Sequence, residues 1–224
     1  MTLPVTLLAW SSGKDCAWAL HALRRSTSVV GLLCTINEAF DRVSMHGTRR
    51  EVVEAQARSA GLDLWQVPVP WPCTNDEYDR RMAEAMVLAR ARGIEQIAFG
   101  DLFLEDVRRY REERLAPTGM RPVFPLWTSP ERTADLAAAM LDAGLRARVA
   151  TVDTRRLDAS LAGREYDERF LALLPAGVDP CGENGEFHTV CFAGPMFASP
   201  IRLEPAGVVV RDGFAYADLA LGRC

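Results

Sequence analysis

Apolar and polar residues alternate in blocks along the first 128 residues, and the block lengths match strands and helices. Four short apolar runs have the length of buried strands: residues 5–10, 29–36, 64–69 and 95–100. Three stretches between them place apolar residues at helical spacing: residues 17–23, 48–60 and 76–92. Strands that alternate with helices in this way predict an α/β fold, in which a parallel sheet carries helices on both faces.

The pattern changes after residue 128, where strands and helices no longer alternate regularly. We expect two helices, at 131–143 and 161–174. The expected strands are at 148–152, 190–193 and 201–210, and a hairpin through residues 212–213 continues to residue 219. A long turn-rich loop, residues 175–186, separates the second helix from the later strands. We therefore predict two domains, residues 1–128 and a smaller α+β domain of residues 129–224.

The composition argues against a nucleic-acid-binding protein, a membrane protein and a cysteine-based metal site. The net charge of −4 gives no general attraction for nucleic acid, which is not an expected partner. No run reaches the roughly 18 apolar residues of a membrane helix, and the N-terminus lacks a signal-peptide pattern, so we expect a cytoplasmic protein without a membrane partner. The six cysteines form no C-x-x-C pair, which argues against a zinc ribbon or an iron–sulfur site. No metal ligand is assigned.

Lys14 is the single lysine among the 26 basic residues of the chain. A lysine ammonium is a compact point charge on a thin stem, whereas the arginine guanidinium is a broad planar fork. A chain that otherwise uses arginine has therefore kept the cation that fits a narrow phosphate site. We predict that Lys14 belongs to such a site.

The residues around Lys14 predict a strand, a tight loop and a helix that begins near Asp15. In that arrangement the loop amides and the helix N-terminus point at one anion site. A simpler role for Asp15, as the cap of the helix, is also left open. A Walker A loop does not match, because Leu8 stands where its first glycine is required. A dinucleotide-binding fingerprint does not match either, since the loop has one glycine.

The sequence Ser-Ser-Gly-Lys-Asp-Cys of residues 11–16 resembles the PP-loop, Ser-Gly-Gly-Lys-Asp-Ser. PP-loop enzymes split ATP between its α and β phosphates and transfer AMP to a substrate. The resemblance implies a Rossmann-like sheet of the HUP type. It also implies a set of ATP-binding residues: Ser11, Ser12, Gly13, Lys14, Asp15, Cys16, His46 and Gly100.

Three further segments resemble the diphthine-ammonia ligase family, also described as adenine nucleotide alpha hydrolases. They are residues 45–46, residues 100–106 with the arginines that follow, and residues 182–189. The last segment resembles the Gly-Glu-Gly-Gly-Glu-Tyr-Glu-Thr of that family, but it departs from the family pattern at Asn184, Phe187 and His188. Cys16 also replaces the final serine of the loop, and a thiol is a weaker hydrogen-bond donor.

This resemblance implies roles for individual residues. The expected catalytic residues are Lys14, Asp101, Glu186 and His188. The expected substrate-binding residues are Glu105, Arg109, Glu183, Asn184, Gly185, Glu186, His188 and Thr189. The simpler structural interpretations stay open, because loop carboxylates are often only solvated and charged helices often carry i, i+4 ion pairs.

The function implied is an ATP-dependent amide ligase with ATP and Mg²⁺ as cofactors. A carboxylate acceptor, on a protein side chain or a small molecule, would be adenylated, and ammonia would then displace AMP. The family acts on a modified histidine of elongation factor 2, and the altered residues 184–188 leave the acceptor of this chain open. A tRNA-modifying adenylating enzyme and a non-catalytic adenine nucleotide-binding protein remain alternatives, and a homodimer is left open.

Overall fold

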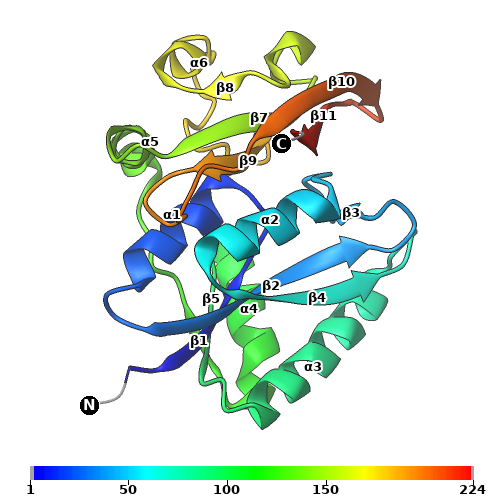
Figure 1. The fold of residues 1–224 in the computed structure, drawn as a ribbon, viewed down its shortest axis with the longest axis vertical. Helices are drawn as coiled ribbons and strands as arrows, with labels where there is room; N and C mark the ends of the chain where they lie inside the picture. Colours follow the sequence, from blue (N-terminus) through cyan, green and yellow to red (C-terminus); the bar gives the residue numbers. More distant parts are fainter. Residues whose placement is uncertain (1–2, 223–224) are drawn as a thin grey trace.

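The computed structural model describes residues 3–222, and the first half of the chain forms one mainly parallel sheet (Figure 1). Its strands are β1 Val5–Ala9, β2 Ser28–Asn37, β3 Arg42–Val43, β4 Asp63–Val69, β5 Gln96–Ala98 and β6 Arg121–Val123. β1 lies between β2 and β5, while β4 pairs with β2 and β6 pairs with β5, all in parallel. β3 runs antiparallel to the end of β2.

Helices cover both faces of this sheet: α1 Lys14–Leu23, α2 Arg50–Ala60, α3 Asn75–Ala91 and α4 Glu105–Leu115. Neighbouring strand residues point to opposite faces. Leu8 of β1 accordingly belongs to the core that contains α1 and α2, and Leu7 belongs to the core that contains α3 and α4. Burial on both faces explains why the strands are continuous apolar runs.

The second half of the chain forms an antiparallel sheet with β7 Arg146–Asp153 at its centre. β7 pairs with β8 Glu165–Tyr166, β9 Phe187–Ala193 and β11 Phe214–Leu221. β10 Leu203–Arg211 pairs with β11 through a tight turn at Asp212 and Gly213, whose φ angles of 52° and 79° are those of a hairpin turn. Two helices complete this half: α5 Thr133–Asp142 and α6 Glu168–Ala172.

Helices α1 and α2 lie between the two sheets (Figure 1). Val52 of α2 packs against Ala150, Val190 and Leu219 of the second sheet, while the next residue, Val53, belongs to the core under the first sheet. One helix is therefore buried from both sides. This packing brings β9 of the second sheet against the N-terminus of α1.

The α/β class, the parallel sheet and the separate antiparallel sheet are confirmed, and the strands and helices predicted up to residue 98 end within about three residues of their observed bounds. The predicted helix at 161–174 is wrong. Gly163 has a φ of 85°, residues 165–166 form β8, and only the short α6 is helical. The short strands β3 and β6 were not expected. The domain boundary near residue 128 stays a prediction.

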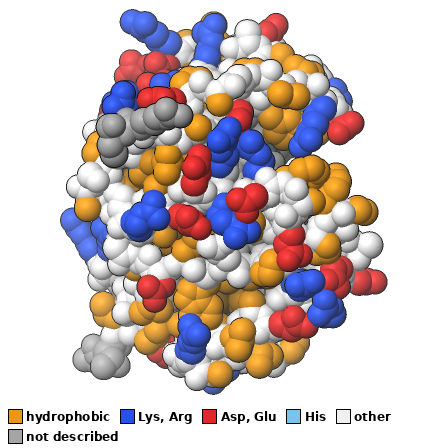
Figure 2. All heavy atoms as spheres, turned by 45° about the vertical axis from the view of Figure 1, so that its right-hand side comes forward, with side chains coloured by type: hydrophobic (Ala, Val, Ile, Leu, Met, Phe, Trp, Pro, Cys, Tyr) orange, Lys and Arg blue, Asp and Glu red, His pale blue; other side chains and the backbone are white. Residues whose placement is uncertain are grey.

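Within residues 3–222, no helix is long and apolar enough to cross a membrane. The five cysteines in this range are free thiols, and Cys34 is buried on β2. Cys224 lies outside the described residues. On the face shown in Figure 2, acidic and basic side chains are interspersed rather than gathered into one basic patch.

Candidate active site

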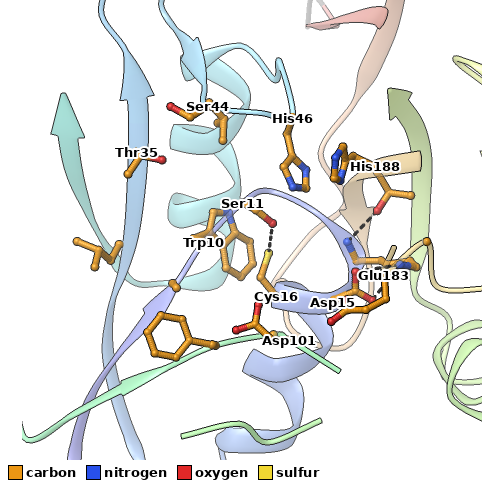
Figure 3. A pocket seen from close by; sticks show the side chains of 18 of the residues that line it. Trp10, Ser11, Asp15, Cys16, Thr35, Ser44, His46, Asp101, Glu183 and His188 are labelled. Atoms are coloured by element: carbon orange, nitrogen blue, oxygen red, sulfur yellow. Dashed lines mark hydrogen bonds and ion pairs between the residues drawn. The ribbon is translucent and has the colours of Figure 1, made fainter. Parts of the chain in front are cut away.

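A cavity of about 280 Å³ opens at the carboxyl ends of β1, β2 and β5, where ligands bind in sheets of this type. The loop after β1 and the loop before β9 form opposite parts of its wall (Figure 3). The cavity brings together these predicted site residues: Ser11, Lys14, Asp15, Cys16, His46, Gly100, Asp101, Glu183, His188 and Thr189.

The loop after β1 is fixed by buried hydrogen bonds to the rest of the molecule. Ser12 has a φ of 76°, a left-handed conformation that favours glycine. Its carbonyl oxygen accepts hydrogen bonds from Gln56 Nε2 at 2.9 Å and Cys191 N at 2.9 Å, and its hydroxyl lies 2.8 Å from that of Thr48. These contacts hold the loop in a strained shape that places the N-terminus of α1 at the cavity.

Lys14 is the first residue of α1 and its side chain is only 1% exposed. Its ammonium lies 2.9 Å from both carboxylate oxygens of Asp15 and donates to the carbonyl oxygen of Cys181. Burial alone lowers the pKa of Lys14, but the opposing attraction of Asp15 and the Cys181 side chain raises the pKa overall. The helix is capped by Gly13, so Asp15 acts as an ion-pair partner and not as the cap.

Lys14 therefore joins the two loops of the cavity. Its backbone N–H also donates to Thr189 Oγ1 at 3.0 Å. Nearby, the Cys16 thiol donates to the carbonyl oxygen of Gly13 at 3.1 Å, and burial raises the pKa of this thiol to about 11. Cys16 is thus a neutral thiol at physiological pH.

Glu183 enters the cavity from the second loop. Its Oε1 accepts a hydrogen bond from Leu102 N at 2.7 Å, and its own N–H donates to Asp179 Oδ2 at 2.8 Å. Burial, together with the negative charges of Asp15 and Asp101, raises the pKa of Glu183 to about 7. Glu183, Asp15 and Asp101 thus line one cavity and influence one another's charge, but the described part of the chain holds no group of three carboxylate, histidine or cysteine side chains arranged to bind a metal ion.

His46 and His188 lie side by side in the cavity (Figure 3), with their rings tilted by 35° and their centroids 4.4 Å apart. Burial lowers the pKa of His188 to about 4 and holds that of His46 well below its usual value. Both imidazoles are therefore neutral at pH 7. Among residues 3–222, His46 Nδ1 has no hydrogen-bond partner.

Asp101 follows β5 and pairs with Arg111 of α4, whose Nε lies 3.1 Å from Asp101 Oδ2. Gly100 lies so close to the loop after β1 that an added Cβ would stand 2.9 Å from Cys16 N. Only glycine allows this approach of two backbones. The end of β5 and the N-terminus of α1 therefore form one continuous surface.

The structure places two predicted substrate contacts outside the cavity. Glu105 and Arg109 are exposed on α4, and neither lines the cavity. Arg111 lines it instead, because a helix turns by about 100° per residue and residues two apart face opposite sides. The substrate-binding roles of Glu105 and Arg109 stay predictions, and Arg111 is the arginine of α4 that lines the cavity.

Glu186 also lies outside the cavity, although it was a predicted catalytic residue. Its side chain is fully buried, and Oε1 accepts from Asp179 N and Asn184 Nδ2, both at 3.2 Å. Arg156 forms an ion pair with it at 3.3 Å. Glu186 thus stabilises the second loop through contacts on the side away from the cavity. Asn184 and Gly185 belong to this bracing turn and do not line the cavity, and neither do Ser12 and Gly13.

Sequence reasoning missed several residues of the cavity wall: Thr35, Ser44, Tyr78 and Met82. Thr35 lies near the carboxyl end of a predicted strand, and that position was a usable signal. Tyr78 and Met82 are four residues apart on α3 and share one face. Nothing in the sequence says that this face points at the cavity.

Comparison with known proteins agrees with these features. The diphthamide synthase N-terminal domain matches residues 5–122, and the diphthamide synthase C-terminal domain matches residues 132–213. Diphthine–ammonia ligase of Homo sapiens is 28% identical over 172 residues, which are 74% of this chain and 62% of that protein. The enzyme of the same name from Bos taurus is 27% identical over 162 residues, covering 70% of this chain and 60% of that protein.

The chain thus spans about three fifths of the length of these relatives. The two matched domains together cover most of the chain, and the two loops of the cavity fall one in each of them. The chain belongs to the diphthamide synthase family.

Proposed function

We propose that this protein is an ATP-dependent amide ligase that forms AMP and pyrophosphate. The observation that carries the proposal is the meeting of the PP-loop-like residues 11–16 and the carboxylate-bearing residues 182–189 in one cavity, joined by Lys14. Relatives named diphthine–ammonia ligase support the same reaction class. A homodimer stays a prediction.

The first loop would hold the phosphates of ATP. The first-turn amides of α1 have no partner inside the helix, and the helix N-terminus favours an anion. Ser11 and the backbone at Gly100 border the same space. Lys14 keeps its charge at neutral pH, since the pKa is raised. Its positive charge would stabilise pyrophosphate as the leaving group.

One or two of the cavity carboxylates, Glu183 among them, could bind Mg²⁺ together with the phosphates of ATP. This ion binds hard oxygen ligands and often needs only one or two carboxylates besides the phosphates. Burial is the main cause that raises the pKa of Glu183, and a cation bound beside this carboxylate would lower that pKa. When bound, the ion would neutralise charge on the β and γ phosphates.

The second loop would serve the acceptor. One carboxylate oxygen of the acceptor forms a bond to the α-phosphorus, and the bond from that phosphorus to pyrophosphate breaks. The nitrogen of ammonia then bonds to the acyl carbon, AMP leaves, and the nitrogen loses a proton. Glu183 lines the cavity with a pKa of about 7, so it is better suited to accept this proton than His188, which a pKa of about 4 makes a weak base.

The test is product analysis after incubation with ATP, Mg²⁺, ammonium and a panel of carboxylic acids. The proposal predicts AMP and pyrophosphate in equal amounts, with a rate that requires both ammonium and a carboxylate. Release of ADP and phosphate would contradict it. Tight ATP binding without turnover under every condition would favour a non-catalytic nucleotide-binding protein.

A further inference from the structure

A second cavity, of about 540 Å³, lies between α3 and α4, next to the first. Its lining is mostly apolar: Met82, Ala83, Met86, Ile97, Phe99, Leu115 and Pro117. Cavities of this size and character are typical of small-molecule sites. No part of the proposed ATP chemistry uses this space.

The polar groups at the rim of the second cavity are largely paired with one another. Asp79 accepts a hydrogen bond from Tyr110 Oη at 2.5 Å and forms an ion pair with Arg114 at 2.6 Å. Arg80 is paired with Glu77 and Glu84. The rim also carries Asp76 and Glu113, and these carboxylates make the mouth unfavourable for a polyphosphate. The chemistry of this cavity therefore favours an apolar molecule over a second nucleotide.

Four side chains line both cavities and form their shared wall: Tyr78, Met82, Phe99 and Arg111. Arg111 stacks on Phe99, with its guanidinium carbon 4.6 Å from the ring centroid. Its pairing with Asp101 is loose, because the second contact of the fork, from Nη2 to Oδ1, is 3.5 Å. The Arg111 side chain is 28% exposed. It can therefore receive a second carboxylate.

Among the described residues that line the first cavity, the two cationic side chains are Lys14 and Arg111. Lys14 is 1% exposed and already bonded to Asp15 and Cys181. Arg111 is thus the cation open to an incoming acid. It stands at the boundary where the polar cavity meets the apolar one.

We infer that the acceptor is a small carboxylic acid with an apolar body, which lies between α3 and α4 while its carboxylate is held at Arg111. This inference rests on the proposed function, because it names the acid that the ligase would adenylate. The apolar body is buried against Met82, Met86 and Leu115, at about 25 cal/mol per Å² of apolar surface removed from water. The carboxylate then points from the shared wall into the cavity proposed for ATP.

Binding of hexanoate and 3-phenylpropionate, measured by calorimetry without ATP, tests the site directly. Hexanamide is the uncharged comparison. Ala83→Trp fills the mouth of the apolar cavity, and Val87→Trp adds the same bulk one turn further along α3, at a residue that is 68% exposed and lines neither cavity. Arg111→Gln removes the charge. Circular dichroism melting shows whether each variant is folded.

The inference predicts saturable binding of at least one acid, weakened about tenfold or more by Ala83→Trp and by Arg111→Gln but within about twofold in Val87→Trp. Hexanamide should bind more weakly than hexanoate. No saturable binding of either acid up to about 10 mM, or binding that Ala83→Trp leaves unchanged, overturns the inference.

Turnover assays separate the two proposals. If hexanoate binds in the apolar cavity but no AMP forms with ATP and ammonium, the ligase function fails while the binding site stands. If AMP forms with acetate or with a peptide carboxylate, equally in the parent and Ala83→Trp, the function stands and the apolar site is not the acceptor site.

Discussion

The two loops that meet at the cavity are built in different ways. The loop after β1 is short, and its shape is set by contacts to its backbone: Gln56 and Cys191 bind the Ser12 carbonyl oxygen. The loop before β9 is long and is held by its own carboxylates, since Asp179 binds Glu183 N and Glu186 binds Asp179 N.

This difference indicates a division of work. A loop fixed through its backbone presents the N–H groups of α1 to the cavity, which suits phosphates of any nucleotide. A loop held by its own carboxylates presents side chains to the cavity, here Glu183 and His188, and we have proposed that it serves the acceptor. Lys14 connects the two, so a change there should damage both.

The largest effect is expected at Lys14. Lys14→Ala removes a buried charge and leaves Asp15 without its partner, so ATP affinity should fall by about 2–3 kcal/mol, roughly a hundredfold in Kd. Lys14→Arg should lose nearly as much, because the buried site has no room for a guanidinium. Calorimetric ATP titration measures both. Arg25→Ala, which removes an exposed charge after α1, is the control and should bind ATP normally.

Gly100→Ala should be the next most damaging change. The new Cβ would press on the backbone of Asp15 and Cys16, which cannot move without moving α1, and the expected loss of stability is about 1–3 kcal/mol. ATP affinity should fall with it. Gly144→Ala is a matched control, since Gly144 has a φ of 81° and no atom within 4 Å of an added Cβ. That variant should lose stability yet bind ATP as the parent does.

Two glutamates of the second loop sharpen the comparison further. Glu183→Gln should lower AMP formation about ten- to a hundredfold, the range typical of changes around a metal site. Glu186→Gln keeps the bracing oxygen and should keep activity within about threefold. Steady-state assays with melting curves decide between them. Equal losses in both folded variants would show that Glu186 acts in the chemistry after all.

The last prediction concerns the pH dependence of stability rather than ATP binding or turnover. The pKa of His188 is lowered to about 4 in the folded protein, whereas the usual pKa of histidine, near 6.5, applies in the unfolded chain. Between pH 6.5 and pH 4 the unfolded chain therefore binds a proton at His188 that the folded chain does not bind. Stability from this residue is therefore intact above pH 6.5 and is lost as the pH falls to 4, by at most about 3 kcal/mol. Urea unfolding of the parent and His188→Gln should show a flatter pH dependence in the variant, and the comparison cancels the contributions of other groups.

Most of the fold could be predicted from the sequence, because the patterns that mark its strands and helix ends are local. Continuous apolar runs mark strands buried on both faces, and Gly61 ends α2 in the left-handed conformation that glycine allows. The helix predicted at 161–174 failed for the opposite reason. Tyr166 is buried by contacts with Phe170 and with Phe187 of β9, and the contact with Phe187 joins residues too far apart in the sequence for a local pattern to predict.

For the site, the sequence located the two loops but not the direction of each side chain. Glu183 and Glu186 are both glutamates of one turn, yet one faces the cavity and the other is buried behind it. Arg109 and Arg111 differ only in the phase of α4 against the sheet. The direction in which each of these side chains points depends on tertiary packing, and it cannot be predicted from a run of charged residues.

Hydrogen exchange with and without α,β-methylene ATP, an analogue that cannot be split between its α and β phosphates, tests the central claim most directly. If the loop after β1 holds the phosphates of ATP, amides in residues 11–16 should exchange more slowly when the analogue is bound, while residues 181–189, β10 and β11 should change much less. Protection that is absent from residues 11–16, or that is equally strong in residues 181–189, would contradict the assignment of ATP to the first loop and of the acceptor to the second.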